Sequence, residues 1–393
     1  MARNHYWRIR DSPNGSYPVQ RGFDKYYGCL HGGGSYHKPS PVYNNLEKVT
    51  DLPDYYYTQA ITDSAVSYVQ AHDTRKPMFL YVAHYAPHLP LQAPAEYVKR
   101  CIDRYKVGYD VLRKQRFEKQ KRIGLIPDNM ELPVFNKEFG GKRPAWEELT
   151  PEQQNKWIKD MATYAAMIEI MDEGIGKLVE EIKKKGMYEN TVFLFLSDNG
   201  ATSEGGFIGQ LMSDLSNTPY RSYKKWVFQS GTSTPFILTY GDKKKNIKKG
   251  EICRQPAHII DIMPTCMALG KIEYPKTFSH SDLPGTSLLP FLKGQPIKPR
   301  TLYFEHQSSC AIIDANWKLV RADRNSQWEL INLTIDPFET NNLAEKYPEK
   351  VDELESKWIN RANTHKVFPL EDKAWTERIN FYQKKNPDQR GED

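Results

Sequence analysis

Two apolar runs of the sequence end in polar side chains that could bind an anion or a metal ion. The run TVFLFL is followed by Asp198 and Asn199, and the run FLYVA is followed by His84 and His88. In open α/β sheets, ligands bind beyond the carboxyl ends of the strands, where the loops converge. These side chains are therefore the first candidates for a functional site.

Asp198 and Asn199 offer a carboxylate and an amide oxygen side by side. Hard oxygen donors of this kind suit Ca²⁺ or Mg²⁺, whereas a zinc site would favour His or Cys. The alternative is an Asx turn in which Gly200 supplies a positive φ, because Asp-Asn-Gly is ordinary turn sequence. The apolar strand directly before the pair favours a functional role, since a turn alone does not need that placement.

Cationic side chains lie in two other segments. His88 stands in APHLP, where two prolines fix the backbone, so it could either face a ligand or cap the turn. Lys224 follows Arg221 and precedes Lys225 in a segment rich in aromatic residues. It could contact an anion or be a surface charge, and both interpretations stay open. His84 alternates with the core residues of its strand, which indicates a structural role.

The elements around these side chains predict an α/β fold. Apolar residues recur three or four apart in 56–72 and in 150–186, which predicts two helices. The segments 77–88, 191–196 and 234–241 are apolar runs of strand length. Continuous apolar strands between helices predict a mixed, mostly parallel sheet that is sandwiched by helices.

The pattern changes after Pro284 and Gly285, where short alternating strands and then an amphipathic helix follow. We expect strands within 301–306, 310–323 and 328–333 and a helix at 347–363. The predicted organisation is an α/β domain at 1–295 and a smaller C-terminal α+β subdomain at 296–393, made of an antiparallel sheet and a helix. The charged segment 97–148 is interpreted as a surface insertion with short helical pieces.

Composition excludes several classes of protein. The chain has 393 residues and a net charge of +6, without the basic stripe and interleaved aromatic residues typical of nucleic-acid binding. It has no run of roughly 18 apolar residues that could span a membrane. The five cysteines form no CxxC pair, and the first residues lack the apolar core of a secretory signal.

Taken together, several segments resemble the sulfatase family, in particular the arylsulfatase branch of the alkaline-phosphatase-like superfamily. The similarity runs in order along nearly the whole chain from residue 18. It is carried by the following segments: PVQRGFDKYYG, KPMFLYVAHYAPHLPLQAP, FLFLSDNGAT, SNTPYRSYKKWV, PAHIIDIMPTCMALG and WELINLTIDPFETNNLA.

The resemblance implies a role for each candidate. Asp198 and Asn199 match the family's metal-binding pair, with Ca²⁺ the usual ion and Mg²⁺ possible. His88 and Lys224 match residues that contact the sulfate group, so the implied ligand is a sulfated small molecule or glycan. Cations and a divalent ion would stabilise charge on the sulfate oxygens during cleavage. Family members suggest a periplasmic or secreted location.

The sequence also departs from the family's pattern. The formylglycine nucleophile is made from a cysteine in Cys-x-Pro-x-Arg, and no cysteine here has that context. The acidic pair that completes the metal site is absent as well, so the chain resembles a sulfatase without its first strand and nucleophile region. Gln229 and Ser230 replace a Glu and a Gly of the family. His5 and Arg3 could correspond to the family's Lys-Trp-His segment.

Three functions are compatible with these features. The first is a sulfuric ester hydrolase whose nucleophile is absent from this sequence. The second is a catalytically inactive sulfatase-fold protein that at most binds a sulfated ligand. The third is a phosphoester hydrolase of the same superfamily, which would need a histidine where Asn199 stands. Neither the particular sulfate ester nor the oligomeric state can be read from the sequence.

Overall fold

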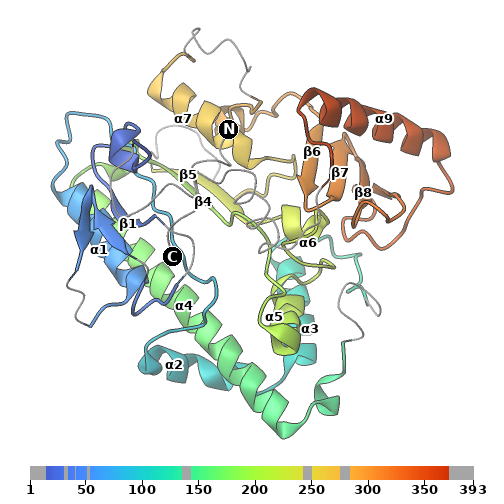
Figure 1. The fold of residues 1–393 in the computed structure, drawn as a ribbon, viewed down its shortest axis with the longest axis horizontal. Helices are drawn as coiled ribbons and strands as arrows, with labels where there is room; N and C mark the ends of the chain where they lie inside the picture. Colours follow the sequence, from blue (N-terminus) through green and yellow to red (C-terminus); the bar gives the residue numbers. More distant parts are fainter. Residues whose placement is uncertain are drawn as a thin grey trace, which may run out of the picture. The chain divides into compact units, whose positions relative to one another are not determined.

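The computed structural model describes residues 15–30, 34–39, 41–50, 54–134, 143–241, 250–274 and 284–370. These residues form two compact units, which are described separately (Figure 1). Unit 1 holds the described residues up to Val107 together with Pro151–Met187, and unit 2 holds those of Gly108–Thr150 and those from Tyr188 onward. Arg3 and His5 lie outside the described residues. The domain boundary near residue 295 stays a prediction.

Unit 1 combines a small sheet with three α-helices. Its elements are η2 (Pro18–Gln20), β1 (Tyr27–Cys29), β2 (Val42–Asn44), β3 (Glu47–Val49), α1 (Tyr57–Gln70), α2 (Ala95–Tyr105) and α4 (Pro151–Lys184). The three strands pair antiparallel in the order β1-β2-β3. Asn45 begins the two-residue turn between β2 and β3 with a φ of 59°, a backbone conformation that Asn adopts more readily than most residues.

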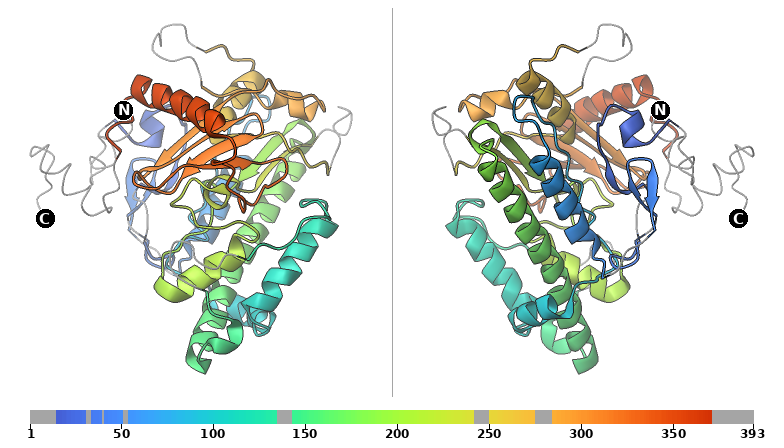
Figure 2. Two further views of the ribbon diagram at one scale, coloured as in Figure 1. Left: turned by 90° about the vertical axis from the view of Figure 1, so that its right-hand side faces the viewer. Right: turned by 90° about the vertical axis from the view of Figure 1, so that its left-hand side faces the viewer.

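The long helix α4 organises unit 1, and it confirms the helix predicted at 150–186. Both α1 and α2 pack along it, and Figure 2 shows α1 beside α4. Met167 and Ile170 of α4 join Tyr57 and Ile61 of α1 in one buried cluster. Trp157, Met161 and Ile182 of the recurring apolar pattern are also buried, whereas Ile168 is 36% exposed.

The strand predicted at 77–88 does not form a ladder within the described residues. No strand is assigned to the segment 77–85. Exposure alternates along it, so that Phe79 is 65% and Tyr81 71% exposed. This period of two is typical of an extended backbone, but the described residues do not confirm the predicted strand.

Unit 2 holds the remaining elements. They are α3 (Tyr109–Arg122), η3 (Trp146–Glu148), η4 (Tyr188–Asn190), β4 (Val192–Leu196), α5 (Gly206–Ser216), α6 (Gln229–Thr232), β5 (Phe236–Tyr240), η5 (Ile259–Asp261), α7 (Ile262–Gly270), α8 (Leu289–Leu292), β6 (Leu302–His306), β7 (Ser309–Asp314), β8 (Trp317–Arg321), β9 (Glu329–Asn332) and α9 (Pro348–Thr364). The segment 97–148 is more regular than predicted, because α3 and most of α2 fall within it.

Strands β4 and β5 confirm two of the predicted strands, at 191–196 and 234–241. They pair with each other antiparallel, and Phe195 lies opposite Ile237 in the register. Both of these side chains are exposed, at 41% and 56%. The fold is mixed α/β as expected, but the described residues do not confirm a mostly parallel sheet.

The C-terminal part of unit 2 matches its prediction closely. Strands β6 to β9 form an antiparallel sheet in sequence order, and α9 covers one face of it (Figures 1 and 2). Leu354 and Trp358 of α9 pack there against Leu319 and Leu330. On the opposite face, Phe228 packs in a second buried cluster. This cluster fixes the chain between Lys224 and α6 to the sheet.

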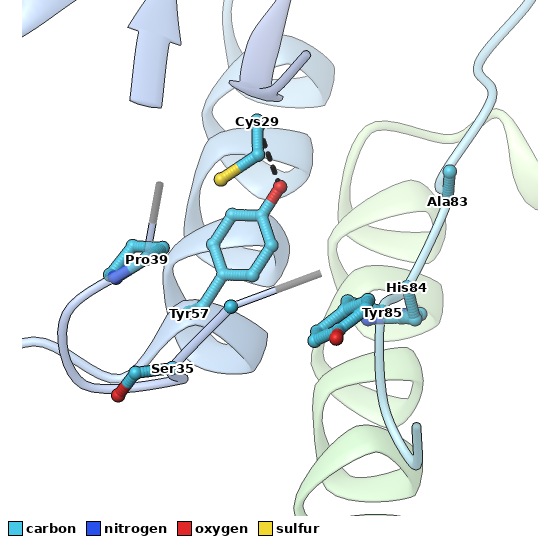
Figure 3. A pocket seen from close by; sticks show the side chains of 8 residues that line it. Cys29, Ser35, Pro39, Tyr57, Ala83, His84 and Tyr85 are labelled. Carbon is cyan, nitrogen blue, oxygen red and sulfur yellow. Dashed lines mark hydrogen bonds between the residues drawn. The ribbon is translucent and has the colours of Figure 1, made fainter. Parts of the chain in front are cut away.

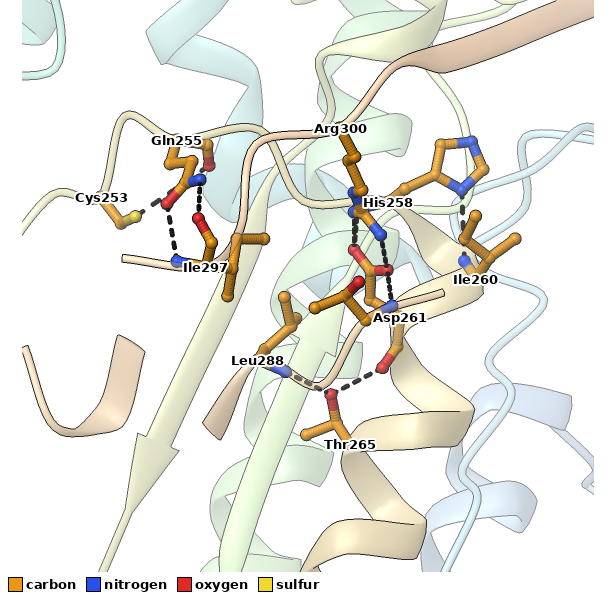
Figure 4. A network of polar contacts seen from close by, with 10 residues as sticks. Cys253, Gln255, His258, Ile260, Asp261, Thr265, Leu288, Ile297 and Arg300 are labelled. Carbon is orange, nitrogen blue, oxygen red and sulfur yellow. Dashed lines mark hydrogen bonds and ion pairs between the residues drawn. The ribbon is translucent and has the colours of Figure 1, made fainter. Parts of the chain in front are cut away.

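A buried polar network holds the start of α7 (Figure 4). Asp261 is fully buried and forms a two-pronged ion pair with Arg300. Its carboxylate also accepts hydrogen bonds from the backbone N–H groups of His258, at 2.7 Å, and Thr286, at 2.8 Å. A buried carboxylate needs several donors of this kind to offset its lost hydration. The network therefore ties the segment 284–300 to α7.

Candidate functional site

The end of β4 carries Asp198 and Asn199 into an exposed position. Pairing continues one residue past the strand, because the N–H of Ser197 donates to the carbonyl oxygen of Pro235 at 3.1 Å. The hydroxyl of Ser197 then donates to the carbonyl oxygen of Asn199 at 2.8 Å. Asp198 and Asn199 follow with exposed side chains. The local backbone is fixed, while the carboxylate and the amide face solvent.

Gly200 is required at this point for a reason other than the predicted one. We considered a turn in which Gly200 has a positive φ, but it is absent from the positive-φ glycines of the described residues. A Cβ at this position would instead lie 1.7 Å from the carbonyl oxygen of Ser230. The loop after β4 is therefore pressed against α6, and only glycine allows this approach.

Lys224 lies beside the loop that follows β4. Its backbone N–H donates to the carbonyl oxygen of Ala201 at 2.9 Å. Its ammonium group lies 3.6 Å from a carboxylate oxygen of Glu204, and its side chain is partly exposed. Unit 2 therefore brings three of the four predicted site residues to one end of β4: Asp198, Asn199 and Lys224.

The two cationic side chains close to Lys224 in the sequence contact other groups. Arg221 is buried, forms an ion pair with Glu329 at 2.6 Å and stacks over the ring of Phe228 at 4.2 Å. Lys225 is exposed, with its ammonium group 5.2 Å from the ring centre of Trp226. Of these three cations, Lys224 is the one whose backbone bonds directly to the loop after β4.

His88 lies in unit 1, in the proline-rich turn that follows the segment 77–85. Its side chain is exposed, and its ring stacks on Tyr85 with ring centres 5.4 Å apart. Nδ1 lies 2.8 Å from the carbonyl oxygen of Leu89. That geometry places a hydrogen on Nδ1, so the neutral ring has its lone pair on Nε2 and the protonated ring donates from Nε2.

His84 occupies a different environment. It lines a cavity of about 170 Å³ in unit 1 together with Cys29, Tyr57 and Tyr85 (Figure 3). Its Nδ1 is buried without a hydrogen-bond partner among the described residues. Burial lowers the pKa of His84 to about 4, because the charged ring loses hydration there. This neutral, enclosed ring is compatible with the structural role expected for it.

The oxygen ligands at the end of β4 are of the kind that a hard cation prefers, but there are few of them. Asn199 uses its Nδ2 to donate to the carbonyl oxygen of Gly200 at 3.0 Å, which leaves its amide oxygen available as a ligand. The described residues include no cluster of three or more His, Cys, Asp or Glu that could hold a metal ion. A calcium ion takes six to eight oxygen ligands, so Asp198 and Asn199 would form part of a site.

Comparisons with known proteins identify the family. The family model described as Sulfatase matches residues 4–272, and a second model, described as N-sulphoglucosamine sulphohydrolase, C-terminal, matches residues 220–365. The chain belongs to the sulfatase family, a family of enzymes that hydrolyse sulfate esters and generally use a divalent metal. By family resemblance, the protein is a sulfatase. The resemblance stated from the sequence is thereby confirmed.

Individual relatives agree with this assignment. An uncharacterised sulfatase of Schizosaccharomyces pombe is 28% identical over 90% of this chain and 72% of its own length. An arylsulfatase of Klebsiella aerogenes is 30% identical over 70% of this chain and 65% of its own length. The chain spans only about half of several other relatives, for example 48% of an N-acetylgalactosamine-6-O-sulfatase of Bacteroides thetaiotaomicron.

Solved structures confirm the fold. The crystal structure of Ps i-CgsB has a TM-score of 0.64 at 24% identity, over 96% of this chain and 75% of that one. The same protein was also solved in complex with k-i-k-neocarrahexaose. A protein in complex with its substrate D-glucosamine-2-N,6-O-disulfate has a TM-score of 0.56 at 19% identity, over 90% of this chain and 78% of that one.

Sequence reasoning missed two residues beside the candidate site. Glu204 pairs with Lys224, and Asn217 hydrogen-bonds to both loops around it. Glu204 lies 20 positions before Lys224, and nothing in that spacing predicts their contact. Asn217 directly follows α5, and its residue type alone gives no functional signal. No helix of the described residues is long and apolar enough to cross a membrane.

Proposed function

We propose that this protein carries the metal-binding and sulfate-binding part of a sulfuric ester hydrolase site. The observation that supports this most strongly is the hydrogen bond from the N–H of Lys224 to the carbonyl oxygen of Ala201. That bond sets an ammonium group beside the loop that bears Asp198 and Asn199. We infer that a carboxylate, an amide oxygen and a cation carried by these adjoining loops serve one site, because a sulfate ester and its counter-ion need such groups.

In this proposal each side chain has a separate task. The oxygens of Asp198 and Asn199 would hold Ca²⁺, with Mg²⁺ as the other candidate, and such an ion would supply positive charge next to the sulfate oxygens. Lys224 donates to a sulfate oxygen. For His88, which lies in unit 1, contact with a sulfate group stays a prediction from the family resemblance. We also propose that β4 belongs to a mostly parallel sheet, with this site at its carboxyl end.

The sulfate donor in this proposal is a sulfated small molecule or a glycan. Sulfated sugars are suggested by the names of several relatives, including the N-acetylgalactosamine-6-O-sulfatase, and by the sugar complex of a structural neighbour. Such substrates are often met outside the cytoplasm, which agrees with the periplasmic or secreted location that the family suggests.

Hydrolysis also needs a nucleophile, which none of the five cysteines supplies in the family's sequence context. We therefore propose that this chain by itself binds a sulfate ester without turning it over. For a longer chain that supplies the nucleophile, we propose the same class of substrate and its hydrolysis. The alternative is a protein whose only activity is to bind a sulfated ligand.

An aryl sulfate assay tests this proposal. The 393-residue protein, supplied with Ca²⁺, is incubated with 4-nitrophenyl sulfate and, in parallel, with 4-nitrophenyl phosphate. We expect no turnover of either compound, together with binding of the sulfate ester that Lys224→Ala weakens. Clear turnover of the sulfate would refute the claim about the nucleophile. Turnover of the phosphate with two bound zinc ions would support a phosphoester hydrolase instead.

A further inference from the structure

Asn217 joins the two loops that carry the candidate site residues of unit 2. We call Ser197–Glu204 the strand-end loop and Asn217–Lys224 the lysine loop. The Oδ1 atom of Asn217 accepts a hydrogen bond from the N–H of Ala201 at 3.0 Å. Its Nδ2 group donates to the carbonyl oxygen of Ser222, also at 3.0 Å. One side chain therefore bonds to both loops.

Because Asn217 is buried, loss of these two hydrogen bonds would be costly. Its side chain is buried, so Ala201 N–H and the Ser222 carbonyl have little water to replace a lost partner. An amide is the side chain that can accept at one end and donate at the other in this geometry. The backbone of Asn217 is held in turn by α5, because its N–H donates to the carbonyl oxygen of Ser213 at 2.8 Å.

The backbone of the lysine loop is unusual next to this contact. Ser222 has a φ of 70°, in the left-handed region that most residues avoid. Its carbonyl oxygen is the atom to which Asn217 donates. Two positions later, Lys224 N–H bonds to the strand-end loop at Ala201. Asn217 thus stabilises the loop conformation that directs Lys224 toward the strand-end loop.

We propose that Asn217 is a positioning residue, which sets the spacing between Lys224 and the Asp198–Asn199 pair. It acts through Ala201 and Ser222 and makes no contact with the ligand. This inference rests on the proposed function for its consequence in sulfate binding. Its structural part, the connection of two loops by one amide, can be tested separately.

Hydrogen–deuterium exchange tests the connection without any ligand. In Asn217→Ala, the amides of Ala201 and Lys224 should exchange roughly tenfold faster than in the wild type. Asn342→Ala is the matched control, because Asn342 also accepts from two backbone N–H groups, those of Leu330 and Ala344. It should leave both loops unchanged. Equal exchange in Asn217→Ala and the wild type would overturn the inference.

A double-mutant cycle tests the effect on sulfate. The affinity for inorganic sulfate, in the presence of Ca²⁺, is measured for the wild type, Asn217→Ala, Lys224→Ala and the double variant. We expect Asn217→Ala to weaken sulfate binding about five- to tenfold in the wild-type background and to have no further effect without Lys224. Asn342→Ala should bind sulfate like the wild type.

The two experiments distinguish a failure of the positioning role of Asn217 from a failure of the proposed sulfate binding. Equal weakening with and without Lys224 would show a general structural effect and would overturn the positioning role. If the wild type does not bind sulfate, the role proposed for Lys224 fails. The exchange experiment would then still decide whether Asn217 holds the two loops together.

Discussion

The ammonium group of Lys224 lies 3.6 Å from a carboxylate oxygen of Glu204. The carboxylate is more than half exposed, while the lysine is only partly so. A sulfate ester that approaches Lys224 therefore meets a nearby negative charge. Glu204 both orients the lysine and competes with the anion for it.

This competition leads to a prediction for Glu204→Gln. Removing the charge should strengthen the binding of inorganic sulfate about two- to fivefold, because an exposed ion pair of this kind contributes at most about 1 kcal/mol. Isothermal titration calorimetry at low ionic strength measures the change. Glu349→Gln, which removes an exposed charge at the start of α9, should have no effect. Weaker binding in Glu204→Gln would show that Glu204 mainly orients the lysine.

Gly200→Ala should disrupt the end of β4. The added methyl group would lie 1.7 Å from the carbonyl oxygen of Ser230, so the strand-end loop or α6 has to move. We expect a loss of at least about 2 kcal/mol in the free energy of unfolding. Gly176→Ala in α4 has open space around it and should be neutral or stabilising by up to about 1 kcal/mol. Similar urea midpoints for both variants would contradict the contact.

The stability of unit 1 should depend on pH through His84. Burial lowers its pKa to about 4 from 6.5, so between these values the unfolded chain binds a proton that the folded chain does not. Stability therefore falls as the pH drops from about 6.5 to about 4, by at most about 3 kcal/mol from this group. Urea denaturation at several pH values measures the slope.

His84→Gln removes the titrating group and should flatten this dependence. His365→Gln, at the exposed end of α9, is the control and should keep the slope of the wild type. An unchanged slope in His84→Gln would mean that other groups cause the loss of stability in acid.

Lys318→Met should destabilise unit 2 strongly. Lys318 and Glu339 form a fully buried ion pair at 2.7 Å, and burial lowers the pKa of the lysine. Glu339 also accepts a hydrogen bond from the N–H of Gln229 at 2.8 Å, which fixes the start of α6. Loss of the lysine leaves a buried carboxylate without its cation, at a cost of about 3–5 kcal/mol.

A double variant provides a second test of the buried ion pair. Lys318→Met combined with Glu339→Gln removes the charge left without its cation and should recover part of the lost stability. A loss below about 1 kcal/mol in Lys318→Met, or no recovery in the double variant, would contradict a tight buried pair.

Elements with a strong local pattern could be predicted from the sequence. The helix at 150–186, the strands at 191–196 and 234–241 and the C-terminal sheet with its helix all formed near the expected positions. Apolar residues three or four apart predict the helices, and apolar runs of strand length, continuous or alternating, predict the strands. Asp198, Asn199 and Lys224 were proposed from their positions beside strands and from the family resemblance, and their roles in binding stay predictions.

Relationships between distant residues could not be predicted. The antiparallel pairing of β4 with β5, and the absence of any strand pairing for 77–85 among the residues that the structure describes, depend on which segments meet, and no local pattern encodes this. The sequence offered a turn with a positive φ only as an alternative for Gly200, and it gave no sign of the close backbone contact with Ser230. Asn217 and Glu204 make their contacts with the loops around Lys224 only in the folded chain.

The most direct test of the proposed site is whether Ca²⁺ and sulfate bind together through these residues. Calorimetry measures sulfate affinity with and without Ca²⁺ for the wild type, Asp198→Ala and Lys224→Ala. We predict that Ca²⁺ strengthens sulfate binding in the wild type, that Asp198→Ala abolishes this gain, and that Lys224→Ala weakens sulfate binding in both conditions. An identical response to Ca²⁺ in Asp198→Ala and the wild type would contradict the proposed site.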